Sequence, residues 1–280
     1  MKRREFIKTS LAASALAGAS QTSLVAAERM NASGRDYYEL RAYKPRNGGS
    51  SDSLDSYLEK AAIPAWNRLG IKSVGVFKET EPPTVSFQGI PRKPEKIGDP
   101  SPLWVLIPHA SLESFATAWS RTNSDSEYQK AGANYLQTAK EDPGFERIDS
   151  WLLLAFAGMP RLEVPELTRE KKARVFEMRT YESYSELKAL KKVQMFNSGE
   201  IDVMKEVKLS PVFYGQALIG KDLPHLTYML CGENKDLHKK HFGDFGKHPT
   251  WDKLKNDPEY ADTVSKIISR YLEPVSYSQI

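Results

Sequence analysis

The chain is poor in the residues and motifs that mark several common enzyme classes. It holds a single cysteine, Cys231, which excludes an intrachain disulfide framework and any zinc site built on paired cysteines. Cys231 stands in an apolar run with no evident base, so we expect a buried thiol and not a nucleophile. Glycine-rich phosphate loops, the GxSxG elbow and the HExxH motif are also missing. Nucleotide binding, serine hydrolysis and zinc proteolysis therefore find no support.

Long apolar runs are equally scarce, and the clearest one lies near the N-terminus. Residues 2–8 read KRREFIK, a twin-arginine pair, and an alanine-rich stretch follows over residues 11–19. Residues 25–27 offer small side chains to a signal peptidase. We therefore expect residues 1–27 to be a Tat-type signal peptide, with export to the periplasm or the cell exterior. The stretch is too short for a comfortable membrane anchor, and we expect no membrane span in the mature chain.

An excess of basic charge is missing once this segment is set aside. Residues 1–27 hold four of the 40 lysines and arginines and one of the 36 acidic residues. The whole chain has a net charge of +4, and the part after residue 27 has a net charge of +1. Nucleic-acid-binding proteins usually carry a larger basic excess, and we expect no nucleic-acid partner. Hydrophobic residues make up 40%, which is enough for a core and excludes disorder as the overall class.

The chain does contain an internal repeat. Residues 37–43 read YYELRAY, and residues 175–181, which lie 138 positions further on, read VFEMRTY. Beyond a proline-rich stretch, residues 82–102, the shift becomes 123. The first half therefore carries an insertion of 15 residues, which we expect to form a loop. The repeat predicts two domains, residues 37–155 and 174–280, joined by a linker over 156–173.

Each half shows the same series of strand and helix patterns. Strands are expected at 37–43, 74–78, 103–108 and 150–156, and again at 175–181, 212–219, 226–231 and near 275–280. In the second half a helix begins near Ser185, has Leu187, Leu190 and the Val193 region on one face, and breaks at residues 197–199. Pro64 marks a comparable break in the first half. The order is β-α-β-β-α-β, the ferredoxin-like unit.

A ferredoxin-like unit leaves one face of its sheet uncovered, because both helices pack on the other face. A second unit in the same chain can cover that face. We therefore expect an α+β protein in which two ferredoxin-like repeats pack sheet to sheet as an intramolecular pseudo-dimeric α/β barrel.

These motifs resemble the NIPSNAP family, in particular its exported bacterial tandem-domain members. The similar stretches are YYELRAY, VFEMRTY, MFNSGEIDVMKEVKLSPVFYGQALIG, LPHLTYML, HPTWDKL and SYSQI. The first half is looser, since Ala61 and Ala62 stand where the second half has Gly199 and Glu200. The resemblance implies the dimeric α/β barrel fold and does not imply a chemistry.

Alternation along the first strand of each half places three polar residues on one face. These are Glu39, Arg41 and Tyr43, and in the second half Glu177, Arg179 and Tyr181. We expect the apolar residues between them to face the helices and the Glu-Arg-Tyr sets to face the space between the sheets. There the arginines would hold a ligand carboxylate or enolate, or the charges would form an internal salt-bridge network.

Histidines are few, five in all. His238 and His241 have the spacing of a helical metal pair, but no cysteine or glutamate completes a site, so we expect an exposed helix face and no metal. His248 precedes a helix restart that would bring it and Trp251 to the cavity mouth. His248 is therefore a candidate acid or base, and Trp251 is either a core residue or a ligand contact.

Three more residues are candidates for the same cavity. Glu200 opens a helix, where a carboxylate is electrostatically favourable, and it is also a candidate for catalysis. Tyr214 and Tyr228 lie on central strands and are candidates for ligand binding, although tyrosines on strands are ordinary packing residues.

Three functions stay open on this basis. The first is an exported barrel that binds a small organic molecule or a protein partner without a cofactor. The second is an enzyme, because barrels of this superfamily include cofactor-free oxygenases and isomerases, and some relatives bind haem. The third is a structural interaction module. The sequence does not identify the ligand or decide whether the chain forms homo-oligomers.

Overall fold

The computed structural model describes residues 34–46, 52–93, 101–141 and 143–280. The expected signal peptide, residues 1–27, lies outside the described residues. The helices and strands of the described residues belong to one unit, Asp36–Ile280. Of the other unit, Met1–Arg35, only Gly34 and Arg35 are described. Among the helices described, none has the length and apolar character needed to cross a bilayer.

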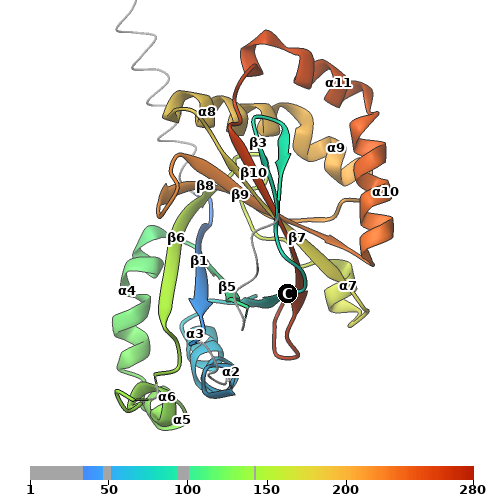
Figure 1. Ribbon diagram of the computed structural model, residues 1–280. Coiled ribbons are helices and arrows are strands. Elements are labelled where there is room, and N and C mark those ends of the chain that lie inside the picture. The colour runs from blue at the N-terminus through green and yellow to red at the C-terminus, as the bar shows by residue number, and fades with distance from the viewer. Residues whose placement is uncertain (1–33, 47–51, 94–100, 142) are drawn as a thin grey trace, which may run out of the picture. The chain divides into compact units, whose positions relative to one another are not determined.

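The first half supplies four long strands with helices between them (Figure 1). The strands are β1 (Tyr37–Lys44), β2 (Gly75–Glu79), β5 (Leu103–His109) and β6 (Arg147–Ala155). Between β1 and β2 lie α2 (Asp52–Tyr57), the π-turn η1 (Leu58–Ala62) and α3 (Ile63–Arg68). Between β5 and β6 lie α4 (Leu112–Asn123), α5 (Ser126–Ala131) and α6 (Ala133–Leu136).

The second half repeats this order after a short helix, α7 (Glu166–Arg169). Its strands are β7 (Val175–Glu182), β8 (Pro211–Ile219), β9 (His225–Gly232) and β10 (Lys266–Pro274). Between β7 and β8 lie α8 (Glu186–Met195), the π-turn η2 (Phe196–Glu200) and α9 (Ile201–Glu206). Between β9 and β10 lie α10 (Lys235–Gly246), α11 (Pro249–Asn256) and the short η3 (Pro258–Tyr260).

Eight of these strands close into one antiparallel barrel. The strand order is β2-β5-β1-β6-β8-β9-β7-β10, and β10 returns to pair with β2. The two halves therefore join at two symmetric seams, β6 against β8 and β10 against β2. The expected fold of two ferredoxin-like repeats in one α/β barrel is confirmed. The two sheets are joined by hydrogen bonds along their edges, and closure leaves no free edge in the ring.

The proline-rich insertion differs from the expected loop. It contains a hairpin of β3 (Thr84–Phe87) and β4 (Ile90–Arg92), and β3 pairs with β10 beside the barrel. Short, exposed strands of this kind are hard to recognise in a sequence, because they bury too little apolar surface to leave an alternating pattern. Residues 94–100 of the insertion lie outside the described part of the chain.

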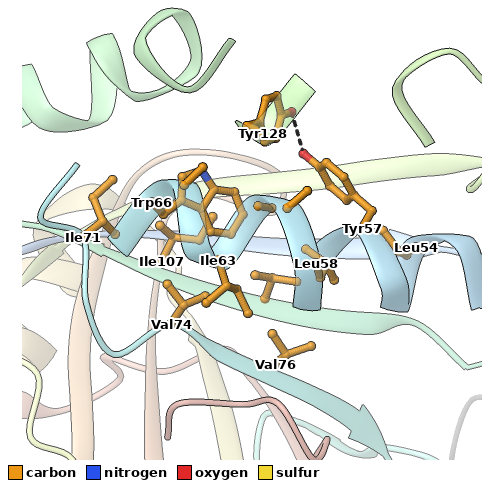
Figure 2. Packing of buried hydrophobic residues seen from close by; sticks show 14 of the residues in the cluster. Leu54, Tyr57, Leu58, Ile63, Trp66, Ile71, Val74, Val76, Ile107 and Tyr128 are labelled. Carbon is orange, nitrogen blue, oxygen red and sulfur yellow. Dashed lines mark hydrogen bonds between the residues drawn. The ribbon is translucent and has the colours of Figure 1, made fainter. Parts of the chain in front are cut away.

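Three apolar clusters organise the interior. The first fills the barrel with side chains from both halves, among them Leu40 and Met178. The second packs α2, η1 and α3 against the strands of the first half, and Figure 2 shows Leu58 and Ile63 of these helices pointing toward Val76. The third packs α8, η2 and α9 against the strands of the second half.

A π-turn interrupts the helix of each half at equivalent positions. In the first half it precedes Pro64, which lies within α3 and not at the break itself. Residues 58–62 and 196–200 are separated by the 138-residue shift of the repeat, and Gly199 has a positive φ of 137° that favours glycine. Ser185 caps α8 as expected, accepting a hydrogen bond from the backbone of Lys188.

The face of α8 chosen from the sequence is right at Val193 and wrong at the two leucines. Leu187 and Leu190 are exposed, and the buried face is formed by Ala189, Lys192 and Val193. One position of the buried face is Lys192. Because a lysine is not apolar, the buried face does not stand out as a hydrophobic pattern in the sequence.

The final segment also departs from expectation, because the last strand ends at Pro274 and residues 275–280 form no strand. Instead, Gln279 exchanges hydrogen bonds with the backbone of Val74, and Ile280 is fully buried in the barrel cluster. The tail thus closes one end of the barrel interior.

Candidate functional site

The polar residues of β1 and β7 face the helices, not the barrel interior. Leu40 and Met178 fill the barrel, whereas Tyr43 and Tyr181 belong to the two helix-side clusters. The predicted orientation of the Glu-Arg-Tyr sets is therefore wrong. An eight-stranded barrel is only wide enough to be filled by its own inward side chains. Apolar side chains can fill the barrel interior because they need no hydrogen-bond partner. The charged side chains lie on the helix side, where residues of the helices can pair with them.

In the second half these residues meet others from the helices, and we call the assembly the C-terminal cluster. It consists of Glu177, Arg179, Tyr181, Lys192, Glu200 and His238. Strand β7 supplies three of them, α8 and η2 supply the lysine and the second glutamate, and α10 supplies the histidine. Figure 1 shows these helices beside the strands of the second half.

Glu177 is the most heavily bonded member of the C-terminal cluster. Its carboxylate accepts hydrogen bonds from Arg179 at 2.8 Å and from Ser269, and one oxygen lies 2.9 Å from Nε2 of His238. Burial raises the pKa of Glu177, but the His238 hydrogen bond and the charge of Arg179 outweigh it and hold the pKa at about 2. Glu177 is therefore a carboxylate at neutral pH.

His238 is buried, which corrects the expected exposed helix face. Nδ1 of its ring has no hydrogen-bond partner among the described residues. The ring packs edge-on against Phe242. His241, three residues further along α10, is only half-buried, so the two histidines do not act together.

Lys192 and Glu200 form a fully buried ion pair. Nζ of Lys192 lies 2.8 Å from a carboxylate oxygen of Glu200, and the residues are 4% and 1% exposed. The ammonium also lies over the rings of Phe196 at 4.6 Å and Trp251 at 5.3 Å. Burial raises the pKa of Glu200 even against the attraction of Lys192. Glu200 thus joins the site, as the sequence allowed, but through a lysine that sequence reasoning missed.

Aromatic side chains enclose these charges. Tyr181 and Tyr228 share a hydrogen bond between their hydroxyls at 2.9 Å, and Tyr214 stacks on Tyr228 with ring centroids 5.3 Å apart. The guanidinium of Arg179 lies 5.6 Å from the ring centre of Tyr181 and 5.1 Å from that of Phe242. Tyr214 and Tyr228 are fully buried on the helix side, so they do not line the barrel interior.

His248 and Trp251 do not lie at the mouth of the inter-sheet cavity, where the sequence predicts them, because both stand on the helix side of the sheet. Trp251 packs against Phe245 and beside Lys192, at the edge of the C-terminal cluster. His248 caps the start of α11, and its other nitrogen pairs with Glu206 on the surface at 3.1 Å. Its role in this structure is therefore that of a helix cap.

The first half builds a simpler version of the same arrangement. Arg41 donates to Glu39 at 2.6 Å and to the hydroxyl of Tyr43 at 3.1 Å, and His109 lies 3.6 Å from Glu39. Burial raises the pKa of Glu39, but His109 and Arg41 outweigh it and hold the pKa at about 2. The guanidinium of Arg41 lies 5.7 Å from the ring centre of Trp66.

The two imidazoles come from different elements of the repeat. His109 ends strand β5, where the second half has Gly232. His238 stands on α10, where the first half has Phe115, and a Cβ on Gly232 would come within 3.1 Å of the His238 side chain. Between the halves the histidine thus moves from the strand end to the helix, and a glycine takes its place on the strand, while each glutamate keeps a neighbouring imidazole. Neither partner could be predicted from the repeat alignment, because the equivalent positions do not hold the same residue.

Metal binding finds no support in this arrangement. Among the described residues, no group of three or more histidine, cysteine, aspartate or glutamate side chains is placed to hold an ion. The polar atoms of the C-terminal cluster are mostly engaged with one another, through the bonds given above.

The comparison with protein families distinguishes the two halves, because a family model matches the second half and not the first. The family model described as NIPSNAP matches residues 176–279. A solved NIPSNAP family protein from Agrobacterium tumefaciens is 16% identical, with a TM-score of 0.34, covering 38% of this chain and 96% of that chain. A solved anthrone oxidase-like protein is 9% identical, with a TM-score of 0.49, covering 87% of this chain and 93% of its own.

A heme-binding protein from Thermus thermophilus is 10% identical, with a TM-score of 0.43, covering 87% of this chain and 92% of that chain. No curated protein matches the chain. The match to the family model spans the strands and helices that carry the C-terminal cluster, and it leaves out the first half. Residues 176–279 are therefore a NIPSNAP family domain.

Proposed function

We propose that the protein binds a small organic acid at the C-terminal cluster, between the helices and the sheet of its second half. The observation that carries this proposal is the buried pair of Lys192 and Glu200. The first half has Leu54 and Ala62 at these positions, and it keeps the same strand, helix and π-turn. The fold therefore does not require the pair.

Energetics favour a role beyond stability. Taking two charges out of water costs several kcal/mol for each ion, and replacing a buried pair with apolar side chains is often neutral or stabilising. Leu54 and Ala62 show that such a replacement fits this helix pair, as their burial in the first helix-side cluster indicates. An ion pair that the fold can spare supports a binding role.

The side chains of the cluster define the ligand class. Arg179 offers a planar fork that suits a carboxylate or an enolate, and Lys192 offers a second positive charge close by. Phe196 and Trp251 flank Lys192 and would contact a flat apolar body. A small aromatic or unsaturated carboxylic acid fits this combination. Arg179 keeps a fifth of its side chain exposed, so the cluster can be reached from the surface.

The test uses the first half as a template for the second. The variant Lys192→Leu/Glu200→Ala copies Leu54 and Ala62 into the NIPSNAP domain. Small molecules that co-purify with the wild-type protein are identified by mass spectrometry, and a panel of aromatic and unsaturated carboxylic acids is screened by thermal unfolding. We expect an acid that raises the unfolding temperature of the wild type and not that of the double variant. The unliganded double variant should be as stable as the wild type, or more stable.

A matched control removes an exposed pair of the same kind. Lys205 and Glu163 lie 2.9 Å apart and are roughly half exposed, so Lys205→Leu/Glu163→Ala should leave ligand binding unchanged. Equal ligand stabilisation of the wild type and the Lys192/Glu200 double variant would overturn the proposal. So would a large loss of stability in the unliganded double variant, because the pair would then serve the fold.

Catalysis is a second candidate function, and the raised pKa of Glu200 is the observation that favours it. A buried carboxyl whose pKa is raised holds a proton more readily than an exposed one, and such groups serve as general acids and bases. Under this hypothesis Glu200→Gln would keep the affinity for the identified acid and abolish its turnover, followed by chromatography of the reaction mixture with and without dioxygen. Unchanged ligand in the wild-type reaction would leave binding as the function.

Export of the protein is part of the same proposal. Its support is the twin-arginine segment, residues 2–8, in front of the alanine-rich stretch. Changing Arg3 and Arg4 to lysine should leave the precursor in the cytoplasm, as immunoblots of cell fractions would show. Normal export of this double variant would contradict a Tat signal.

A further inference from the structure

The open end of the barrel contains a small cavity that is separate from the C-terminal cluster. Its volume is about 50 Å³, and it is lined by inward-facing side chains from both halves. The residues that matter for its chemistry are Trp104, Trp151, Thr180, His225, Thr227 and Arg270. Ile280 closes the other end of the barrel interior, so this end is the one that remains accessible.

His225 is the feature of this cavity that points to a ligand. The residue is 4% exposed, and its Nε2 atom has no hydrogen-bond partner among the described residues. A buried ring nitrogen without a partner is unfavourable, because it has lost its hydrogen bond to water and gained none in the protein. Burial also lowers the pKa of His225, so the ring is neutral at neutral pH and carries one N–H. Such a group favours an occupant that completes its hydrogen bond.

The neighbouring hydroxyls are compatible with a proton on Nε2 of His225. Thr180 and Thr227 lie 3.0 Å apart through their hydroxyl oxygens, and the Thr227 hydroxyl lies 3.4 Å from Nδ1 of His225. If the hydroxyls donate in sequence toward Nδ1, that nitrogen accepts and Nε2 carries the N–H. Nε2 then offers a donor into the cavity, and its natural partner is an oxygen acceptor.

The walls of the cavity are flat and aromatic. Trp104 and Trp151 stack with their ring centroids 5.8 Å apart at an interplanar angle of 24°. The guanidinium of Arg270 lies 5.2 Å from the ring centre of Trp104 and pairs with Glu79 at 3.2 Å. A flat group can therefore lie along the indole rings while its oxygen atoms face His225.

Charges of both signs lie around the cavity. Arg270 and Lys221 are positive, and Glu182 and Asp222 are negative. Glu182 is bonded to Lys266 at 2.9 Å, which neutralises it locally. Lys221 is paired with Asp149. Asp222 has no ion-pair partner among the described residues, so the charges at the cavity give no positive excess, and the donor on His225 decides the preference for an oxygen acceptor.

The size of the cavity limits the occupant. One water needs about 10–15 Å³ of such volume, so the cavity holds about four non-hydrogen atoms. We propose that the mouth of the barrel binds a small planar carboxylate of the size of acetate, with a carboxylate oxygen accepting the Nε2 hydrogen of His225. This site lies on the inner face of the sheet, and it does not depend on the function proposed for the C-terminal cluster.

The test follows the ring-proton NMR signal of His225 while sodium acetate is added, with sodium chloride at equal ionic strength as the reference. We expect a saturable shift with acetate and none with chloride. Benzoate should give no saturable shift, because its ring does not fit a cavity of this size. A linear acetate response, or the same response to chloride, would overturn the proposal without any mutation.

Variants assign the effect to His225. His225→Phe keeps a ring of similar size and removes the unpartnered nitrogen, so it should be as stable as the wild type and bind acetate about tenfold more weakly, as detected by isothermal titration calorimetry. Lys221→Gln, at the exposed rim, should fold normally and weaken binding to a smaller extent. His241→Gln on α10 is the control and should bind as the wild type does. Unchanged acetate affinity in His225→Phe would contradict the site.

Discussion

Nε2 of His238 lies 2.9 Å from the carboxylate of Glu177, and this contact joins helix α10 to the first strand of the NIPSNAP domain. In the first half the equivalent glutamate, Glu39, lies 3.6 Å from Nε2 of His109, which comes from a strand. Both halves thus bury a carboxylate beside an imidazole, although the imidazole arrives from different elements. Both halves keep a histidine beside the buried glutamate, although the histidine comes from a helix in one half and from a strand in the other. This indicates that the fold depends on the contact between glutamate and histidine.

This relationship predicts a compensating pair of substitutions. His238→Phe should destabilise the protein by about 1–3 kcal/mol, because Glu177 loses a buried hydrogen-bond partner. Adding Gly232→His, which copies His109 and Phe115 of the first half, should restore part of the loss. Urea unfolding of the two single variants and the double variant gives the coupling energy. His241→Phe is the control, with an expected change below about 0.5 kcal/mol. A double variant less stable than either single variant would contradict the exchange.

Acid stability should depend on the two buried glutamates. The pKa values of Glu39 and Glu177 fall from 4.5 to about 2 on folding, so each carboxylate stabilises the protein above the unfolded pKa. That stability is lost as the pH falls from about 5 to 2, and it amounts to on the order of 3 kcal/mol for each group. Unfolding free energies across this range should show Glu177→Gln losing less stability on acidification than the wild type. Parallel curves would contradict the lowered pKa.

Much of the fold could be predicted from the sequence, because each half independently shows the same order of strands and helices. The paired motifs at residues 37–43 and 175–181 gave the strand order, and closure followed from the uncovered face of a single unit. The direction of the strand faces could not be derived in this way. Alternation separates Glu177 from Met178, but it does not say which set faces a barrel interior that is filled by its own side chains.

The candidate site was predictable only where one segment carried the signal. Glu177, Arg179 and Tyr181 share a strand, so their spacing marked them together. Lys192 and His238 reach the same place from helices, and pairing across elements leaves no trace in a single sequence. Lys192 also lies where helical periodicity calls for an apolar residue, which misdirected the choice of the buried face of α8. The cavity at His225 depends on both halves and could not be foreseen from either.

The tail should contribute to stability through its last side chain. Ile280 is fully buried in the barrel cluster, so Ile280→Ala should destabilise the protein by about 2–5 kcal/mol through lost burial and a new cavity. Ile219→Ala makes the same chemical change at a position that is 64% exposed, and it should cost less than about 0.5 kcal/mol. Equal effects in urea unfolding would show that the tail does not close the barrel in solution.

Cys231 should report opening of the barrel. Its side chain is fully buried in the barrel cluster, and burial raises its pKa to about 12. At about pH 8 roughly one thiol in 10⁴ is then ionised, and only the thiolate reacts with iodoacetamide. We expect no modification of the native protein by mass spectrometry, and full modification in concentrated urea. Between these limits the rate should follow the population of unfolded molecules, because no smaller opening exposes the interior of a closed ring of strands.

A control for reagent and pH is Ser120→Cys in a Cys231→Ala background, which places a thiol on the exposed face of α4. This variant should react quickly without urea. Rapid modification of Cys231 in the native protein would contradict a closed ring. It would point instead to separation along a seam between the halves, either β6 from β8 or β10 from β2, since those contacts alone join the two ferredoxin-like sheets within the described barrel.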